Sequence, residues 1–557
     1  MAFRRSAQTL VTKKKCIPEL ARKYPWTRPQ GDETGISIYN FYTRSKLPLI
    51  LSTEGNLKWY VCGPTVYGEP HVGHACSFVR FDVIRRILMN VFDINVVFMM
   101  NFTNVDDKII DKAKKVGQTT EQVSSHYEST FLKNMQQLNV LRPTIVHRVS
   151  DNVQNVIEFI ERLVESGHAY VTGQGSVFFH CDSYEGYGNL SRMKVLPSEK
   201  TMFDDQKRKP QDFLLWKPHK VGEPFWDSPW GQGRPGWHIG CSALASKVFG
   251  GKIDIHCGGG DLKFPHHENE LAQSNCYHHT NQWVNYWIHS GLVRREGDSE
   301  KMSKSRGNII TIPELLEKYT SNQFRMFCLL RPYAMEVEYG ENAMKKPVQI
   351  LNKLTSHRAV AQSYIHGEGP SVDVSNDVLM QHLASTQKVV RSALADNFDT
   401  QQMMSALMSL VQVCNRELSK PSNKNVIRAR EVYSVAAITS YIDKLMSQLG
   451  FNLISKLESH ADSANSSQSL EDIINSVTHF RERVRSFALG GDAANATDEE
   501  KSLIRVHRDS HSALLDSTDQ LRDKLAATAG IIIKDAEEGP STWHMIEKTS
   551  DRPSARE

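Results

Sequence analysis

The sequence predicts an α/β protein with a Rossmann-like core, an inserted segment, and a C-terminal α-helical bundle domain. Two observations carry this prediction. Residues 57–62 and 96–100 are short apolar runs separated by a stretch with helical apolar spacing, and strand, helix, strand in this order forms a right-handed crossover unit. Residues 344–458 repeat apolar positions at helical spacing instead. A chain of 557 residues has room for two to four domains.

The elements of the core follow in order. Leu57–Cys62 reads as a strand, and the turn Gly63-Pro64 ends it. A helix is expected after His74, because apolar residues recur there at helical intervals up to Val91. The run Val96–Met100 has no polar alternation, as expected for a strand that is buried on both faces.

The rest of the chain divides by composition. We expect a catalytic domain over residues 31–343, split by an insertion at about 142–236 that is turn-rich and aromatic and contains a helix near 153–165. Residues 344–458 form the helical domain, whose apolar stripe from Met403 to Leu418 is typical of a bundle core. Residues 459–557 read as a partly mobile linker and a C-terminal tail, with a helix around Leu514–Leu525, a stop at Gly530 and a strand after it.

Charge is concentrated at the start of the chain. Residues 1–30 carry eight lysines and arginines and one acid, whereas the remainder has 59 basic and 62 acidic residues. Such a basic, acid-poor leader is typical of a mitochondrial transit peptide; the alternative is a basic arm that touches RNA. No apolar run reaches 18 residues, so we expect no membrane span. The nine cysteines are too irregularly spaced for a disulfide framework, which indicates a reducing compartment. We also expect a monomer.

Two short motifs stand in a fixed order. His71-Val72-Gly73-His74 follows the first strand and opens a helix, where backbone N–H groups and the helix dipole favour phosphate. Lys301-Met302-Ser303-Lys304-Ser305 supplies two ammonium groups suited to a triphosphate in its transition state. Together the motifs predict an ATP site that forms an adenylate.

Four further residues suggest a metal site: Cys62, Cys241, His266 and Glu270. His266 and Glu270 are four residues apart and share one helix face. Two thiolates, an imidazole and a carboxylate suit Zn²⁺. From these residues alone, Cys62 could equally be a small buried hydrophobe and the His–Glu pair a surface pair. The set lacks paired Cys-x-x-Cys motifs, which favours a substrate-facing site over a structural one.

Four longer stretches resemble cysteinyl-tRNA synthetases, which are class I aminoacyl-tRNA synthetases. They are Tyr60-Val61-Cys62-Gly63-Pro64-Thr65-Val66-Tyr67, Asn101-Phe102-Thr103-Asn104-Val105-Asp106-Asp107-Lys108-Ile109-Ile110, Gly236-Trp237-His238-Ile239-Gly240-Cys241-Ser242 and Phe264-Pro265-His266-His267-Glu268-Asn269-Glu270. The similarity runs from about residue 38 to 339 and returns at residues 395–400 and 530–543. With its basic leader, the chain is most similar to the mitochondrial members.

The resemblance implies an activity. It implies ATP-dependent ligation of L-cysteine to tRNA(Cys) through a cysteinyl-adenylate, for translation in the mitochondrial matrix, with Mg²⁺ accompanying ATP. One zinc ion would bind the four residues above and take the substrate thiolate as a further ligand. Because Zn²⁺ prefers a thiolate to a neutral hydroxyl, the metal would separate cysteine from serine without an editing domain. The helical domain would hold the anticodon stem.

The resemblance also implies residue roles. Gly63, Thr103, Trp237 and His266 match positions that bind the amino acid. The positions matching the ATP site and the catalytic motifs are His71, His74, Gly258, Gly259, Asp261, Lys301 and Lys304, with Gly260 in the same glycine-rich turn. Lys304 is the expected triphosphate lysine, and Lys301 assists it.

The chain departs from the family pattern at two positions that bear on function. Asp111 replaces a frequent lysine, and Cys257 stands where glycine is usual and is not expected to be a ligand. A secondary synthesis of cysteine persulfide is also suggested for this family, with pyridoxal phosphate held by signature-loop lysines. The alternatives are a ligase that transfers activated cysteine to a small-molecule amine, a zinc hydrolase, and a non-catalytic RNA-binding relic.

Overall fold

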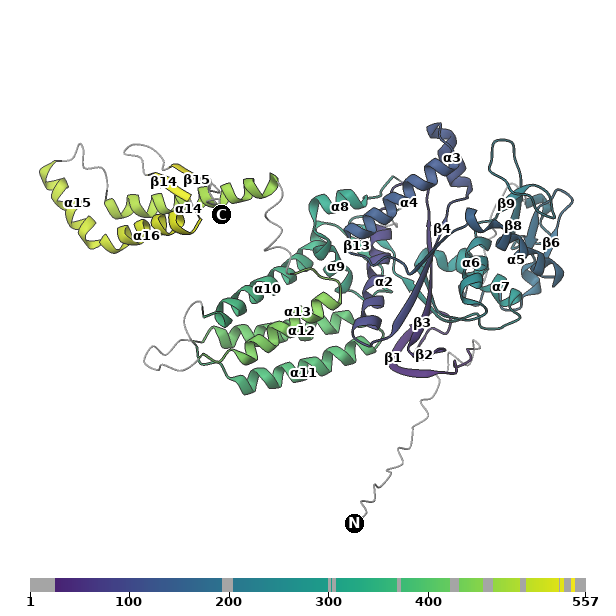
Figure 1. Cartoon of the computed structure of the whole chain (residues 1–557), viewed down its shortest axis with the longest axis horizontal. Helices are drawn as coiled ribbons and strands as arrows, with labels where there is room; N and C mark the ends of the chain where they lie inside the picture. Colours follow the sequence, from purple (N-terminus) through teal and green to yellow (C-terminus); the bar gives the residue numbers. More distant parts are fainter. Residues whose placement is uncertain are drawn as a thin grey trace, which may run out of the picture. The chain divides into compact units, whose positions relative to one another are not determined.

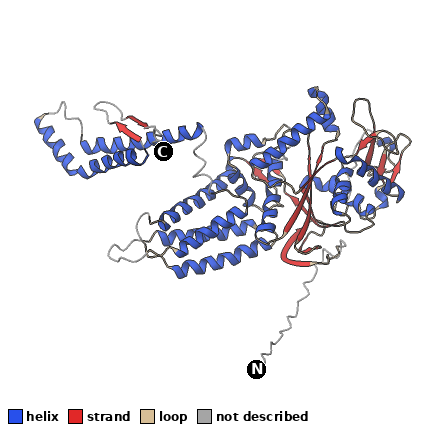
Figure 2. Cartoon of the chain, viewed as in Figure 1, coloured by secondary structure: helices blue, strands red, loops and turns tan. Residues whose placement is uncertain are grey.

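The computed structural model describes residues 26–192, 204–298, 302, 307–367, 372–420, 430–453, 464–490, 497–529, 531–534 and 542–545. The chain forms two compact units, Met1–Leu453 and Ile454–Glu557. Figure 1 labels their elements and Figure 2 separates helices from strands. None of the described helices is long and apolar enough to cross a membrane.

A five-stranded parallel sheet organises the first unit. Its strand order is β11-β10-β3-β4-β5, and the strands are β3 (Asn56–Thr65), β4 (Asn95–Thr103), β5 (Ile145–Arg148), β10 (Ile253–Gly259) and β11 (Val284–Ser290). Every residue of β11 is buried, as expected for a strand covered on both faces. The predicted strands at residues 57–62 and 96–100 lie within β3 and β4, and the α/β fold class is confirmed.

Helices connect the strands of this sheet. They are α2 (Val72–Asn90), α3 (Asp107–Val116), α4 (Thr120–Gln137), α6 (Ile239–Phe249) and α7 (Glu268–Tyr277). The helix predicted after His74 is α2, which links β3 to β4 by the expected crossover. Short turns lead into α7: a 3₁₀ turn (Gly260–Leu262) and a π-type turn (Lys263–His267). This layout brings the carboxyl ends of β3, β4 and β10 together, which is where ligands bind in open α/β sheets.

The insertion begins later than the sequence indicates. The boundary at about residue 142 places Ile145–Arg148 in the insertion, but this strand pairs with β4, with Met99 opposite Ile145. Its four residues alternate between half-buried and exposed, so it lacks the apolar run that marks the inner strands. The insertion proper contains α5 (Val153–Glu165) and an antiparallel sheet of β6 (Ala169–Val171), β7 (Val177–Phe179), β8 (Phe213–Pro218) and β9 (Gly233–Pro235). Two 3₁₀ turns accompany it, Cys181–Ser183 and Asp204–Gln206.

Smaller elements flank the main sheet. They are the hairpin β1 (Asp32–Asn40) and β2 (Ser45–Leu51), the 3₁₀ turn Ser150–Asn152, the pair β12 (Val293–Arg295) and β13 (Val337–Tyr339), α8 (Ile312–Lys318) and α9 (Ser321–Leu329). The chain before β1 is docked as well: Trp26 is buried and its Nε1 donates to the Asn285 carbonyl at 2.8 Å. The predicted leader, residues 1–30, therefore includes a residue that packs against the first unit.

Four helices that pack against one another follow in the described part of the first unit, side by side in Figure 1. They are α10 (Glu341–Ile365), α11 (Asn376–Ala395), α12 (Thr400–Leu418) and α13 (Tyr433–Gln448). The stripe predicted from Met403 onward is buried on α12 up to Cys414, with Leu418 half-buried at its end. One continuous apolar core joins these helices to the sheet.

The second unit contains α14 (Ala464–Leu489), α15 (Asp498–Ser510), α16 (Ser512–Ala529) and the antiparallel hairpin β14 (Ile531–Lys534) and β15 (Thr542–Met545). The predicted tail helix and strand correspond to α16 and β14, while Gly530 lies outside the described residues. Within the segment predicted to be a partly mobile linker, α14 and α15 are helical. Buried Ile474, Arg481 and Ala488 give α14 an inner face that composition alone does not reveal.

Candidate active site and metal centre

One cavity of about 600 Å³ opens at the carboxyl ends of β3, β4 and β10. Its lining includes Cys62, Gly63, His71, His74, Thr103, Trp237, Gly258, Gly259, Asp261 and His266. Every predicted amino-acid and ATP position that the structure describes therefore faces the same space. Lys301 and Lys304 lie outside the described residues. Met302, between them in sequence, lines the cavity and donates its N–H to the Val293 carbonyl at 3.1 Å.

The first motif caps helix α2 at this cavity. The His71 Nδ1 accepts from the Gly73 N–H at 3.1 Å, and the His74 Nδ1 accepts from the His71 N–H at 3.3 Å. This reciprocal capping box leaves the helix N-terminus facing the cavity, where its dipole favours an anion. A Cβ at Gly73 would lie 2.8 Å from the His71 ring, so a larger residue there would push this ring from its capping position.

The backbone comes unusually close at Gly63, just after Cys62. A Cβ there would lie 1.8 Å from the Asn101 carbonyl oxygen, so no larger residue fits without moving β4. The glycine lets the β3 end pass directly beside β4 while its own backbone borders the cavity. A bound amino acid could thus approach main-chain groups that a side chain would otherwise cover.

The four predicted metal ligands converge from four separate elements. Cys62 lies near the carboxyl end of β3, Cys241 lies on α6, His266 precedes α7, and Glu270 lies in the first turn of α7. All four are buried, and one ligand atom from each lies within 4.8 Å of every other. The His266 Nε2 is 2.7 Å from the Glu270 Oε1, and the Cys62 Sγ donates to that same oxygen at 2.9 Å. These buried donors fit Zn²⁺ by chemical type and by convergence.

The electrostatics of the four groups are tightly linked. The hydrogen bond from Cys62, opposed by burial and reinforced by His266, lowers the pKa of Cys241 to about 5. Burial works against protonation of His266, but Glu270 and Cys241 outweigh it and raise the pKa of His266 to about 10. Burial would raise the pKa of Glu270, yet His256 and His266 hold it well below its usual range. Without a metal, the cluster therefore contains a thiolate, an imidazolium and a carboxylate.

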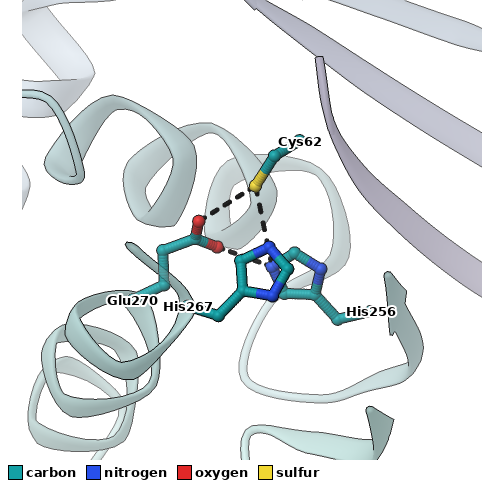
Figure 3. A group of neighbouring side chains, drawn as sticks. All are labelled: Cys62, His256, His267 and Glu270. Carbon is teal, nitrogen blue, oxygen red and sulfur yellow. Dashed lines mark hydrogen bonds and ion pairs between the residues drawn. The ribbon is translucent and has the colours of Figure 1, made fainter. Parts of the chain in front are cut away.

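Figure 3 shows a second group that shares two of these residues, made up of Cys62, His256, His267 and Glu270. Its ligand atoms also lie within 4.8 Å of one another. The His256 Nε2 is 2.6 Å from the Glu270 Oε2 and 3.9 Å from the Cys62 Sγ. The His267 Nδ1 is 2.9 Å from the His289 Nε2. Sequence reasoning missed His256 and His267 as neighbours of the site.

Further groups hold the predicted ligands in place. The His238 Nδ1 is 2.8 Å from the His266 Nδ1, and the Asn101 Nδ2 donates to the Cys241 Sγ at 3.2 Å. Cys257 belongs to neither ligand group and instead accepts from the Trp59 Nε1 at 3.0 Å. Such outer contacts fix the orientation of metal ligands.

Aromatic residues form one wall of the cavity. The Trp237 ring centroid is 4.8 Å from that of His266. The Lys108 Nζ lies 5.9 Å from the Trp237 ring and 5.5 Å from the Tyr67 ring, within range of a cation–π contact. All three residues line the cavity. Asp111, one turn further along α3, is exposed.

Comparison with known proteins gives one family. Residues 49–349 match the family described as "tRNA synthetases class I (C) catalytic domain". A Xenopus tropicalis protein named "probable cysteine–tRNA ligase, mitochondrial" is 41% identical over 94% of this chain and 92% of its own length. A Dictyostelium discoideum protein named "cysteine–tRNA ligase, cytoplasmic" is 35% identical over 96% of this chain and 80% of its own.

The fold also resembles solved structures. A methionyl-tRNA synthetase from Mycobacterium tuberculosis, solved with methionyl-adenylate, superposes with a TM-score of 0.55 at 15% identity. The superposition covers 73% of this chain and 95% of that one. At this identity the similarity concerns the fold alone, namely a parallel α/β core followed by helices.

Proposed function

The chain belongs to the cysteine–tRNA ligases, which are class I aminoacyl-tRNA synthetases, and we propose that it joins L-cysteine to tRNA(Cys) in the mitochondrial matrix. In this proposal ATP activates the cysteine carboxylate, and zinc held by Cys62, Cys241, His266 and Glu270 selects the cysteine thiol. One observation carries it: two of the four metal donors, Cys62 and His266, line the same cavity as both predicted substrate sites.

In the first step, a carboxylate oxygen of cysteine attacks the α-phosphorus of ATP, forming cysteinyl-adenylate and releasing pyrophosphate. The glycine-rich turn at Gly258 and Gly259 lets adenosine approach the backbone, and Asp261 is placed for a ribose hydroxyl. The capped N-terminus of α2 faces the phosphates, and Lys301 and Lys304 neutralise the charge that develops on them, together with Mg²⁺. Positioning and charge neutralisation account for most of the catalysis in such a displacement.

In the second step, the 2′-hydroxyl of the terminal tRNA adenosine attacks the activated carbonyl and AMP leaves. The helices α10–α13 would hold the anticodon stem, since they extend from the sheet as one packed bundle. The Xenopus and Dictyostelium relatives match this chain along the helical bundle as well as along the catalytic core. This match favours tRNA over a small-molecule amine as the acceptor.

Selectivity is the task of the metal site. Serine differs from cysteine by one atom, so a pocket that reads shape alone separates them poorly. When bound, zinc supplies a soft position that accepts a thiolate in preference to a hydroxyl. A discrimination of ~10⁴ corresponds to about 5.5 kcal/mol, a magnitude within reach of a metal–thiolate bond. Trp237 lies against His266 and lines the same cavity, so it would bound the space in which the cysteine side chain would bind.

The mitochondrial assignment rests on the basic leader and on the name of the Xenopus relative. The leader before residue 26 lies outside the described residues. A secondary synthesis of cysteine persulfide, with pyridoxal phosphate on Lys301 or Lys304, stays a prediction from family resemblance. Asp111 stands where the family frequently has a lysine, so one lysine that could have taken part in this synthesis is absent.

The zinc assignment is tested by substituting one ligand and one neighbour. Cys241→Ser should contain much less than one zinc per chain and should lose most cysteine-dependent ATP–pyrophosphate exchange, because the remaining donors compensate poorly. Cys257→Ala is the matched control: it is equally buried but outside both ligand groups, so it should keep its zinc. Full zinc retention by Cys241→Ser would contradict the proposed set of zinc ligands. Circular dichroism checks that both variants fold.

A further inference from the structure

The two oxygens of Glu270 face two different partners. The Oε1 meets the His266 Nε2 at 2.7 Å and the Cys62 Sγ at 2.9 Å, both of which belong to the proposed zinc set. The Oε2 meets the His256 Nε2 at 2.6 Å. The carboxylate is fully buried, so each oxygen needs a partner to offset its desolvation. Glu270 is thus held between a metal-facing side and a histidine-facing side.

His256 is itself held rigidly. It lies in the middle of β10 and pairs in register with Tyr60 on one side and Trp287 on the other. Its imidazole stacks on the Trp287 ring with centroids 4.7 Å apart and an interplanar angle of 27°, and it has no solvent exposure. A Trp283 ring meets it edge-on at 5.8 Å. A side chain packed in this way has little room to turn, so it can fix the orientation of whatever it bonds.

Cavity lining separates the two ligand groups that share Cys62 and Glu270. In the first group, Cys62 and His266 both border the cavity, so an ion there presents an open position to a substrate thiol. In the second, whose residues are drawn in Figure 3, only Cys62 borders the cavity, and His256 and His267 do not line it. The first group also offers two sulfur donors, whereas the second offers one. The first group is therefore the softer set of donors, which favours it as the site of a zinc ion that selects a thiolate. His256 is left with the carboxylate oxygen as its partner.

We propose that His256 is a positioning residue that holds the Glu270 Oε2 away from the metal, so that Glu270 binds through Oε1 alone. A carboxylate free to bind through both oxygens would add a hard oxygen ligand where the substrate thiolate must enter. Held by His256, the carboxylate leaves that position open, and cysteine keeps its advantage over serine. This inference rests on the proposed zinc-dependent selection of cysteine and adds a specificity-determining residue to it.

The test compares two amides at position 256. In His256→Gln the amide nitrogen falls close to the place of the imidazole Nε2 and can still donate to Glu270. In His256→Asn it falls near the place of Nδ1, too far back to do so. His289→Gln is the matched control, because this buried histidine contacts His267 and not Glu270. The readouts are metal content, the visible spectrum of the Co²⁺-substituted protein, and pyrophosphate exchange with cysteine and with serine.

His256→Asn should keep about one metal per chain but lose about 10- to 100-fold in the cysteine-over-serine ratio, the usual cost of removing an outer partner of a metal ligand. Its Co²⁺ bands should weaken, as expected when a further oxygen joins the metal. His256→Gln and His289→Gln should stay close to the unmodified protein in both readouts.

Three results would overturn the inference. Complete metal loss in both position-256 variants would make His256 a ligand and the group in Figure 3 the true site. An unchanged Co²⁺ spectrum and an unchanged cysteine-over-serine ratio in His256→Asn would show that His256 contributes only to packing. An equal loss of the cysteine-over-serine ratio in His289→Gln would show that the effect comes from a general disturbance of the site. A failure of the proposed function looks different, because the unmodified protein would then bind no zinc or would not prefer cysteine.

Discussion

At the scale of single residues, three of the four predicted metal donors have a second partner that orients them. His256 meets Glu270, His238 meets His266, and Asn101 meets Cys241, all through buried side chains. In the metal-free protein these donors also stabilise one another's charges, which is why a carboxylate and an imidazole can be buried side by side. The same cluster must release protons before it can coordinate an ion.

The first prediction is therefore proton release on zinc binding. Glu270 and Cys241 raise the pKa of His266 to about 10 against the effect of burial, and burial with the neighbouring Cys241 raises the pKa of Cys62. At neutral pH both groups carry protons that zinc must displace, so zinc affinity should rise with pH and binding should release about two protons. Calorimetry in two buffers of different ionisation enthalpy measures this number. Binding without proton release would contradict the assigned ligand set.

The second prediction concerns Lys304, which rests on sequence because it lies outside the described residues. Lys304→Ala should slow pyrophosphate exchange strongly while leaving the affinity for cysteine nearly unchanged. The reason is that its ammonium group meets charge that is greatest in the transition state, so the loss belongs to the rate. Pre-steady-state measurement of adenylate formation separates the two constants. An unchanged rate would exclude the loop from the chemistry.

The sequence was sufficient to single out four residues that the structure brings together, but not the residues that support them. Cys62 and Cys241 stand in stretches that resemble a known family, and His266 with Glu270 shows helical spacing. His256 gives no such signal: it sits in an apolar strand, and its distance from Glu270 depends on how β10 lies beside β3 and α7. Contacts that depend on the order of the strands in a sheet cannot be predicted from the spacing of residues along the sequence.

At the scale of elements, an ion-pair network fastens the insertion to the core beside the cavity. Asp107 opens α3 just after β4, and its two oxygens meet Lys217 on β8 and Arg234 on β9, each at 2.5 Å. Arg234 is nearly buried and also bonds Glu223. Trp237 follows β9 by two residues, so this network fixes the start of the segment that carries the aromatic wall.

The third prediction follows from Asp107. Burial raises its pKa, but Lys217 and Arg234 outweigh this and lower the pKa of Asp107 to about 2. Because the folded-state pKa is depressed, its stabilisation is present above the unfolded pKa of about 4 and is lost as the pH falls toward 2. Asp107 is half-exposed, so Asp107→Asn should cost only about 1 kcal/mol of unfolding free energy at pH 7.

Urea unfolding at pH 7 and at pH 3 measures this difference. It should shrink at the lower pH, because below about pH 4 the unfolded carboxylate binds a proton while the native carboxylate, whose pKa is about 2, stays mostly ionised. Glu223→Gln, on the far side of Arg234, is the comparison that tells a general effect on the insertion from one specific to α3. An equal cost for Asp107→Asn at both pH values would show that the charge of Asp107 is not responsible.

Element prediction from sequence worked where burial is strong and failed where it is weak. Inner strands β3 and β4 are apolar and were predicted, whereas the edge strand β5 has a half-exposed pattern and was assigned to the insertion. The polar composition of residues 459–503 predicts a linker, but α14 has a buried face that includes Arg481, whose Nε donates to the Thr518 carbonyl at 2.8 Å. A buried arginine does not register as part of an apolar stripe.

At the scale of the whole molecule, the fourth prediction separates the leader from the enzyme. Deleting residues 1–24 should abolish mitochondrial import of a tagged protein and leave tRNA charging intact, because a basic, acid-poor leader directs import. Deleting residues 1–30 should also lower stability, since it removes Trp26, whose ring packs 6.0 Å from that of Tyr286. Import assays in cells and charging assays in vitro measure both effects.

The alternative, an arm that touches RNA, makes the opposite forecast. Deleting residues 1–24 would then leave import unchanged but weaken tRNA affinity and flatten its salt dependence, because phosphate contacts are lost. Cytosolic residence of the full-length protein would contradict the mitochondrial assignment while leaving the ligase activity untouched.

The most direct measurement of the central claim is pyrophosphate exchange followed by transfer, with the full chain and zinc present. Exchange should depend on cysteine and be negligible with serine, and cysteinyl-tRNA should form on addition of tRNA(Cys). Exchange that proceeds without any transfer to tRNA, or that serine supports as well as cysteine, would contradict it.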